Sequence, residues 1–359
     1  MSERKKSTRR KDRAIIGEKI EEDASIGRKR SAAQRRWRIL AKALTTGSGE
    51  GENADEEEEI SVRRFAGFDL LRPICVEKAA GEPAGSGWYE YSAVLENEPF
   101  SVQIRRLKSN GFTANELIGF NNTGNVCVWP SEECLAYYLL KNREICRGRR
   151  VLELGGGMSC LAGLIAGKYC GPSGVTVTDG NATSVDNVRR IISRNGLADS
   201  VECAVVRWAK AAEAIGAFAA SPPPRVHDAT RVKSRMTGGG DCNGDGDEAA
   251  KISEKPYDVI LCADCLFFDE ARLDLVETIY GWLANDGMAL VMAPGRGSTF
   301  EKFAEAAMKR GFVARRIDRY DGRVWSRHLE LLEHTREYRP DLHYPILLEL
   351  TKRRKTPPG

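Results

Sequence analysis

The sequence lacks any long apolar run. No stretch approaches the ~20 consecutive apolar residues that span a bilayer, so we expect no membrane-spanning segment. The N-terminus is polar and mixed in charge, without the apolar core of a secretory signal, and six acids among the first 23 residues disfavour a transit peptide. These absences predict a protein that is neither secreted nor bound to a membrane.

A complete metal-binding pattern is also missing. The chain has ten cysteines, and Cys262 and Cys265 have the C-x-x-C spacing, but no second pair and no histidine pair completes a zinc site. Residues 241–246 match the first half of an EF-hand loop, yet Ile252 stands where calcium needs a glutamate. We expect no metal, and we interpret most cysteines as reduced core residues of an intracellular protein.

Charge of either sign shows little excess overall, since 55 lysines and arginines face 51 acids and the net charge is +4. The excess lies in residues 1–43, which contain 15 basic and 6 acidic side chains, so the rest of the chain is slightly acidic. A slightly acidic folded part argues against a nucleic-acid groove, because such grooves are basic.

The first part of the chain divides into a polar arm and a β-rich extension. Residues 1–59 are basic and largely disordered by composition, with a short helix expected at 33–44 and an acidic linker at 46–59. Basic clusters in the arm are either nuclear import signals or a solvated tail, and we expect a cytoplasmic and nuclear monomer. Residues 60–120 contain strand-like segments at 60–65, 89–95 and 100–105.

The main domain, expected over residues 121–352, is organised around a glycine turn. A buried strand at 150–154 leads into Gly155, Gly156 and Gly157, and an apolar helix follows. Glycines there allow a tight turn and a close approach of a ligand to the helix N-terminus. The sixth position of the turn is Cys160, which departs from the dinucleotide-binding pattern.

After the turn, strand-like and helix-like segments alternate, which predicts a doubly wound α/β sheet of the Rossmann-like kind. Strands are expected at 175–179, 201–208 and 287–294, a strand with its exit at 257–267, and a final strand pair at 312–320 and 343–351. Residues 221–256 form a flexible insertion, and 353–359 are a basic tail. Such a sheet binds ligands beyond the carboxyl ends of its strands.

Two acids stand at strand ends. Asp179, about 24 residues after Gly155, could bind both ribose hydroxyls of a nucleotide or cap a turn. Asp264 could face the ligand or cap the helix expected from about Ala271. We prefer the ligand-facing interpretation for both. Asp179 alone does not separate a methyltransferase from an NAD enzyme.

Two tryptophans flank these motifs. Trp129 precedes a helix expected at 132–140 with Ser131 as its N-cap, and Trp208 ends the strand expected at 201–208. Either indole could be an ordinary packed aromatic or could line a ligand pocket.

Several segments together resemble the calmodulin-lysine N-methyltransferases, which are seven-β-strand, S-adenosylmethionine-dependent protein-lysine methyltransferases. They are residues 61–65, 121–133, 153–158, 178–181, 262–267 and 343–345. The triple glycine followed by Met158, and the sequence Cys-Ala-Asp-Cys-Leu-Phe at 262–267, are more specific than the motifs of the wider class. The resemblance extends from about residue 61 to residue 352 and excludes the basic arm and the insertion.

The resemblance implies transfer of methyl groups from S-adenosylmethionine to one lysine of calmodulin, up to trimethyllysine. It also implies a set of residues around the cofactor, namely Trp129, Glu153, Gly155, Gly156, Gly157, Asp179, Trp208 and Ala263. Relatives that act on other proteins commonly have a tyrosine three positions after the strand-exit acid. Phe267 stands there in this chain, which puts more weight on Asp264 as the catalytic residue.

Other functions fit less well. An enzyme that methylates nucleic-acid amines would have a proline pair where Cys265 and Leu266 stand, and the final strand pair is not typical of NAD folds. A lysine methyltransferase of another protein, or a calmodulin-binding module with a vestigial site, stay open as alternatives.

Overall fold

The computed structural model describes residues 67–77, 86–107, 127–208, 255–266, 269 and 271–353. The import clusters, the helix expected at 33–44, the strand at 60–65, the EF-hand-like loop and Phe267 lie outside the described residues.

A seven-stranded sheet forms the centre of the structure, in the order β6-β5-β4-β7-β8-β10-β9. Its strands are β4 (Arg150–Leu154), β5 (Gly174–Asp179), β6 (Val201–Val205), β7 (Tyr257–Ala263), β8 (Leu283–Ala293), β9 (Phe312–Ile317) and β10 (Ile346–Lys352). The first five run parallel, and β10 is antiparallel to both β8 and β9. The predicted doubly wound, Rossmann-like sheet with a final strand pair is confirmed, and the structure shows that this pair is antiparallel.

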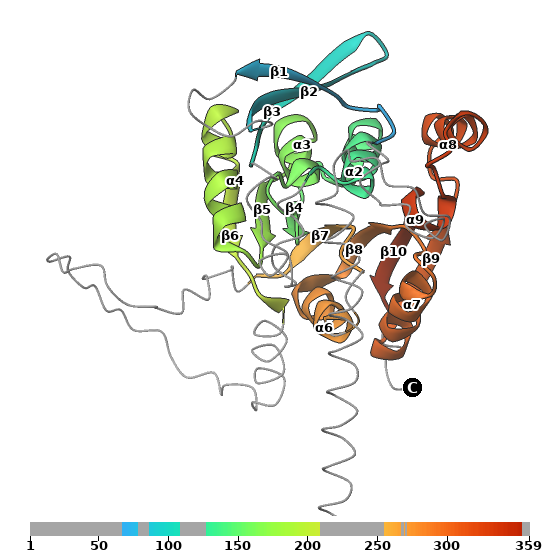
Figure 1. The fold of residues 1–359 in the computed structure, drawn as a ribbon. Coiled ribbons are helices and arrows are strands. Elements are labelled where there is room, and N and C mark those ends of the chain that lie inside the picture. Colours follow the sequence, from blue (N-terminus) through green and yellow to red (C-terminus); the bar gives the residue numbers. More distant parts are fainter. Residues whose placement is uncertain are drawn as a thin grey trace, which may run out of the picture. The chain divides into compact units, whose positions relative to one another are not determined.

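Helices cover both faces of this sheet, as parallel strands require (Figure 1). One layer contains α2 (Pro130–Lys141), α3 (Leu161–Tyr169) and α4 (Ala182–Arg194). The opposite layer contains α6 (Arg272–Trp282) and α7 (Thr299–Arg310). Central strands are therefore apolar on both faces: Leu152 of β4, Ile260 of β7 and Leu290 of β8 have no exposed surface. In the part of the chain that the structure describes, no helix is both long and apolar enough to cross a membrane.

A second sheet of three antiparallel strands precedes the main one: β1 (Arg72–Glu77), β2 (Gly87–Leu95) and β3 (Glu98–Arg106). Strands expected at 89–95 and 100–105 correspond to β2 and β3. Side chains of the main domain hold β3: the Tyr169 hydroxyl bonds the backbone of Ser101, and the Asn195 amide bonds that of Gln103. The small sheet is thus packed against α3 and α4.

Glu133 of α2 fastens the segment before β1. Its carboxylate accepts hydrogen bonds from the backbone N–H groups of Phe68 (2.8 Å), Leu70 (2.6 Å) and Leu71 (3.0 Å). All four residues are buried, and burial raises the pKa of the Glu133 carboxyl. A buried acid is stable here because three amides face it.

Some expected boundaries were wrong. Helix α2 begins at Pro130 with Trp129 as N-cap, so Ser131 is an interior residue and not the cap. A proline suits the first helical position because its missing N–H would have no partner there. Strand β6 ends at Val205, three residues before Trp208, and β8 starts at Leu283 instead of Gly287. Two helices were not anticipated, α8 (Gly322–His334) and α9 (Pro340–His343).

Candidate active site

The candidate site lies where β4, β5, β7 and β8 end. Gly155 follows β4, Asp179 ends β5, Asp264 follows β7, and Arg296 lies in the loop after β8. Parallel pairing of these strands brings their carboxyl ends to one edge of the sheet. Residues within the strands are mostly buried, whereas Gly155, Ala263 and Cys265 at their ends are partly exposed. The edge is therefore open to a ligand.

The glycine turn needs its glycines. Gly155 and Gly157 have φ of +66° and +60°, in the left-handed region that favours glycine. A Cβ on Gly155 would lie 2.7 Å from Cys265 Sγ and 2.9 Å from Cζ2 of Trp208, so the two side chains are packed directly on this residue. Gly156 is as constrained, since a Cβ there would lie 2.9 Å from the Cα of Cys160. Neither position has room for a side chain, because neighbouring protein groups already lie against the backbone of the turn.

Asp179 is joined to the glycine turn. Its carboxylate accepts hydrogen bonds from the N–H groups of Gly157 (3.0 Å) and Asn181 (2.9 Å). Helix α4 is capped by the Asn181 side chain, while the bond from Asn181 N–H shows that Asp179 does cap the turn before this helix. Burial raises the pKa of the Asp179 carboxyl to about 6, against the lowering effect of these bonds. The acid and the turn are therefore held in contact, as a nucleoside site requires.

Two further carboxyl groups lie beneath the turn. Glu153 is fully buried and accepts a hydrogen bond from Gly163 N–H (2.9 Å), and burial raises its pKa to about 8. Glu132 accepts from the Ser159 hydroxyl and from Leu161 N–H (2.9 Å), and burial raises its pKa to about 7. Both acids support the first turn of α3 from below. This role of Glu132 was not anticipated from the sequence.

Asp264 forms an ion pair with Arg296. Both guanidinium ends take part: one Nη contacts Oδ1, and the other lies 2.9 Å from Oδ2. Helix α6 starts at Arg272 with no side-chain cap, so Asp264 does not cap it. Sequence reasoning missed Arg296, although its place between two glycines after the fifth strand was a weak signal.

The remaining predicted residues differ in position. Trp129 is half-buried, and the Arg296 guanidinium carbon lies 5.9 Å from its ring centroid. Trp208 is 6% exposed and its ring covers Gly155. Ala263 is the last residue of β7, directly before Asp264. The structure thus brings Trp129, Gly155, Asp179, Trp208 and Asp264 to one edge, while the Glu153 carboxyl lies below it.

S-adenosylmethionine fits the donor set at this edge. Asp179 supplies two carboxylate oxygens that suit a ribose, and it stands at the end of β5 beside the glycine turn, where such sheets bind nucleosides. Glu153 Oε1 is buried with no hydrogen-bond partner in the described residues, so the polar groups under the turn are incompletely satisfied by the protein alone. Predicted cofactor contacts of individual residues stay predictions.

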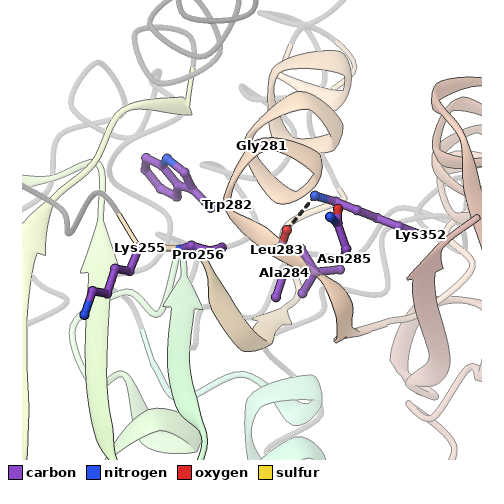
Figure 2. Close-up of a pocket in the computed structure, with 8 residues that line it drawn as sticks. All are labelled: Lys255, Pro256, Gly281, Trp282, Leu283, Ala284, Asn285 and Lys352. Carbon is purple, nitrogen blue, oxygen red and sulfur yellow. Dashed lines mark hydrogen bonds between the residues drawn. The ribbon is translucent and has the colours of Figure 1, made fainter. Parts of the chain in front are cut away.

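A cavity of about 250 Å³ occupies the opposite edge of the sheet (Figure 2). It lies where β7 and β8 begin and β10 ends, with Trp282, Pro256, Lys255 and Lys352 in its wall. Lys352 Nζ donates a hydrogen bond to the Leu283 carbonyl (2.5 Å). None of the predicted site residues lines this cavity.

Among the described residues, His, Cys, Asp and Glu side chains form no cluster that could hold a metal ion.

A lysine methyltransferase family model matches residues 111–217 of the chain. A calmodulin-lysine N-methyltransferase of Arabidopsis thaliana is 28% identical over 334 residues, which cover 89% of this chain and 97% of that protein. The protein-lysine N-methyltransferase EFM3 of Chaetomium thermophilum is 34% identical over 123 residues, 34% of this chain and 35% of that protein. A TehB-like SAM-dependent methyltransferase structure from Corynebacterium glutamicum is 16% identical with a TM-score of 0.37, covering 61% of this chain and 88% of that one.

Proposed function

We propose that this chain, a protein-lysine methyltransferase that uses S-adenosylmethionine, methylates a lysine of calmodulin up to the trimethyl state. The observation that carries the choice of substrate is the similarity to the Arabidopsis enzyme, which runs over nearly the whole of both chains. The similarity to EFM3 covers about a third of each chain and therefore supports the lysine methyltransferase class more than a substrate.

The cofactor residues have distinct proposed roles. Asp179 binds the ribose hydroxyls, Trp208 lies against the adenine, and Trp129 closes the pocket near Arg296. Gly155, Gly156 and Gly157 let the cofactor approach the backbone, and Ala263 leaves room beside them. Glu153 lies beneath the turn and maintains the shape of the turn by accepting a hydrogen bond from Gly163 N–H of α3. Bound S-adenosylmethionine supplies a methyl group that is already activated on its sulfonium, so no protein nucleophile is needed.

Asp264 is the proposed catalytic residue. A lysine ammonium with a pKa of about 10.4 must lose a proton before it can accept a methyl group. Asp264 can attract the incoming ammonium and then hold the neutral amine in line, while water takes the proton. Its two oxygens each have a further lone pair beside the one that faces Arg296. Asp264→Asn should therefore lower the transfer rate without preventing cofactor binding.

The test is incubation of the purified chain with unmethylated calmodulin and labelled S-adenosylmethionine, followed by peptide mass analysis. Label on a single lysine, rising to three methyl groups, is the expected result. Cofactor binding without transfer would reject calmodulin and direct the search to another protein lysine. Loss of both binding and transfer would favour a calmodulin-binding module with a vestigial site.

A further inference from the structure

We propose that Arg296 is a positioning residue that fixes the Asp264 carboxylate and the Trp129 indole relative to each other. The inference rests on the proposed catalytic role of Asp264. It assigns a function to a residue in the loop between β8 and α7 that none of the sequence motifs contains.

The Arg296–Asp264 pair is unusually well buried. Exposed fractions of the two side chains are 11% and 6%. In each of the other ion pairs within the described residues, at least one side chain is more than a third exposed; Lys141–Asp321 and Arg272–Asp269 are examples. Burying two charges costs solvation free energy, and this cost makes such a pair a poor source of stability. A role in the site explains the pair better.

Both residues also adopt a left-handed backbone. Asp264 has φ of +56° and Arg296 has φ of +40°, which residues with a Cβ rarely adopt. Strain of this kind is retained where a precise arrangement of groups is required. The two residues follow the adjacent parallel strands β7 and β8, and their side chains meet in the ion pair.

Backbone hydrogen bonds hold each residue in place. Asp264 N–H donates to the Met292 carbonyl of β8 (2.8 Å), and Arg296 N–H donates to the Asp341 carbonyl of α9 (2.7 Å). The pair is therefore anchored at both ends by other elements. Because both backbones are held in this way, the guanidinium of Arg296 and the carboxylate of Asp264 keep a fixed relative position.

Arg296 has a geometry that lysine lacks. Its planar fork contacts both carboxylate oxygens at once, which fixes the rotation of the carboxylate as well as its position. The guanidinium carbon also lies 5.9 Å from the Trp129 ring centroid, within range of a cation–π contact. One side chain thus connects the proposed acceptor-holding acid with the proposed cofactor wall.

A double-mutant cycle tests the proposal with Arg296→Lys, Asp264→Asn and the combined variant. We expect Arg296→Lys to lower kcat for methyl transfer about tenfold or more while KM for the acceptor changes about threefold or less. The combined variant should be no slower than Asp264→Asn alone, because Arg296 acts through Asp264. Losses that multiply in the combined variant, or an Arg296→Lys rate within about twofold of the unchanged chain, would overturn the proposal.

Arg316→Lys is the matched control. Arg316 also forks onto an aspartate, Asp318, and its guanidinium carbon lies 5.4 Å from the Phe300 ring, but both charged side chains are about half exposed. This variant should leave kcat unchanged.

A second readout does not depend on calmodulin. Sinefungin carries an amine where S-adenosylmethionine has its transferable methyl group, so its affinity relative to S-adenosylhomocysteine reports whether the site attracts a cation there. Calorimetry should show that preference falling several-fold, by a similar factor, in Arg296→Lys and Asp264→Asn. An unchanged preference in Arg296→Lys overturns the proposal even if calmodulin is not the substrate. If Arg296→Lys does not fold, the double variant Arg296→Gln with Asp264→Asn, in which both side chains are neutral, replaces it. The preference of this double variant for sinefungin over S-adenosylhomocysteine must then match that of Asp264→Asn alone.

Discussion

At the scale of single residues, three buried carboxyl groups distinguish the candidate site. Burial raises the pKa to about 7 for Glu132, about 8 for Glu153 and about 6 for Asp179. The first two support α3, whereas Asp179 contacts the glycine turn at the open edge. Burial of a carboxyl group therefore bears on folding stability for Glu132 and Glu153, and on the proposed ligand binding for Asp179.

Replacing Asp179 should weaken cofactor binding. Asp179→Ala removes the proposed charge-assisted hydrogen bonds to the ribose, and since even one of them is worth about 1.5–3 kcal/mol, the Kd for S-adenosylmethionine should rise at least about 10- to 100-fold. Cofactor affinity of the unchanged chain should also fall as the pH drops below about 6, because the protonated acid accepts fewer hydrogen bonds. Calorimetry across this range measures both effects. Asp186→Ala, an exposed acid on α4, is the control. Equal Kd values for the two variants would contradict the ribose role.

Glu132 should make stability depend on pH. The unfolded chain loses the Glu132 proton near the ordinary pKa of 4.5, whereas the folded chain keeps it to about pH 7. The folded state therefore binds more protons between these values, and stability falls as the pH rises through this window. Glu132→Gln keeps an acceptor for Leu161 N–H but has no proton to lose, so it should gain up to about 3 kcal/mol relative to the unchanged chain from low to neutral pH. Urea unfolding at several pH values measures this, and a constant difference would exclude it.

At this scale, sequence was informative where chemistry restricts the residue type. Glycines in a tight turn and an acid at a strand tip can be recognised from spacing alone, and the structure places Gly155 and Asp179 in contact through Gly157. Arg296 could not be recognised in the same way, because its importance depends on a partner 32 residues away in sequence. Glu132 and Glu133 illustrate the same limit, since their partners are backbone amides of distant segments.

At the scale of elements, the turn from β4 to α3 restricts substitution of its glycines in two ways, through the positive φ of the backbone and through crowding of any added side chain. Gly155 and Gly148 have nearly equal φ, +66° and +65°, but a Cβ on Gly148 would meet no atom within 4 Å. Alanine at either position should cost about 1–2 kcal/mol from the backbone alone. Gly155→Ala should cost more and should raise the cofactor Kd at least about tenfold, because its methyl group would collide with Trp208 and Cys265. Urea unfolding and calorimetry of both variants provide the comparison. Similar results for the two would show that crowding at Gly155 has no effect.

Secondary structure was predictable where a periodic pattern is long and buried. Strands β4, β5 and β7 are largely apolar segments that lie where they were expected, although β7 ends at Ala263, within the strand and exit expected at 257–267. Boundaries were less predictable where local and tertiary preferences compete, as at Trp129, where capping chemistry suggested Ser131 but proline set the start of α2. Helix α8 begins directly after its N-cap residue, Asp321. It was not predicted, because the residues between the two strands of the final pair were assigned no element.

At the scale of the whole molecule, charge is divided unequally along the chain. Residues 1–43 hold the basic excess, and calmodulin is strongly acidic, so this arm should speed encounter with the proposed substrate. Removing residues 1–43 should lower the association rate and flatten its dependence on salt, because fewer charges attract the partner. Stopped-flow measurements at low and high salt test this. An unchanged salt slope would mean that the arm does not take part in encounter.

The Glu133 contact with Phe68, Leu70 and Leu71 determines where the chain can be cut. A fragment that starts at residue 127 would contain every strand of the central sheet and every residue of the proposed site. Such a fragment would nevertheless lack residues 68–71, which cover α2. The Glu133 carboxylate and an apolar face that are now buried would then be exposed to water. We therefore expect a fragment that folds stably to begin before Phe68 and to keep the three-stranded sheet.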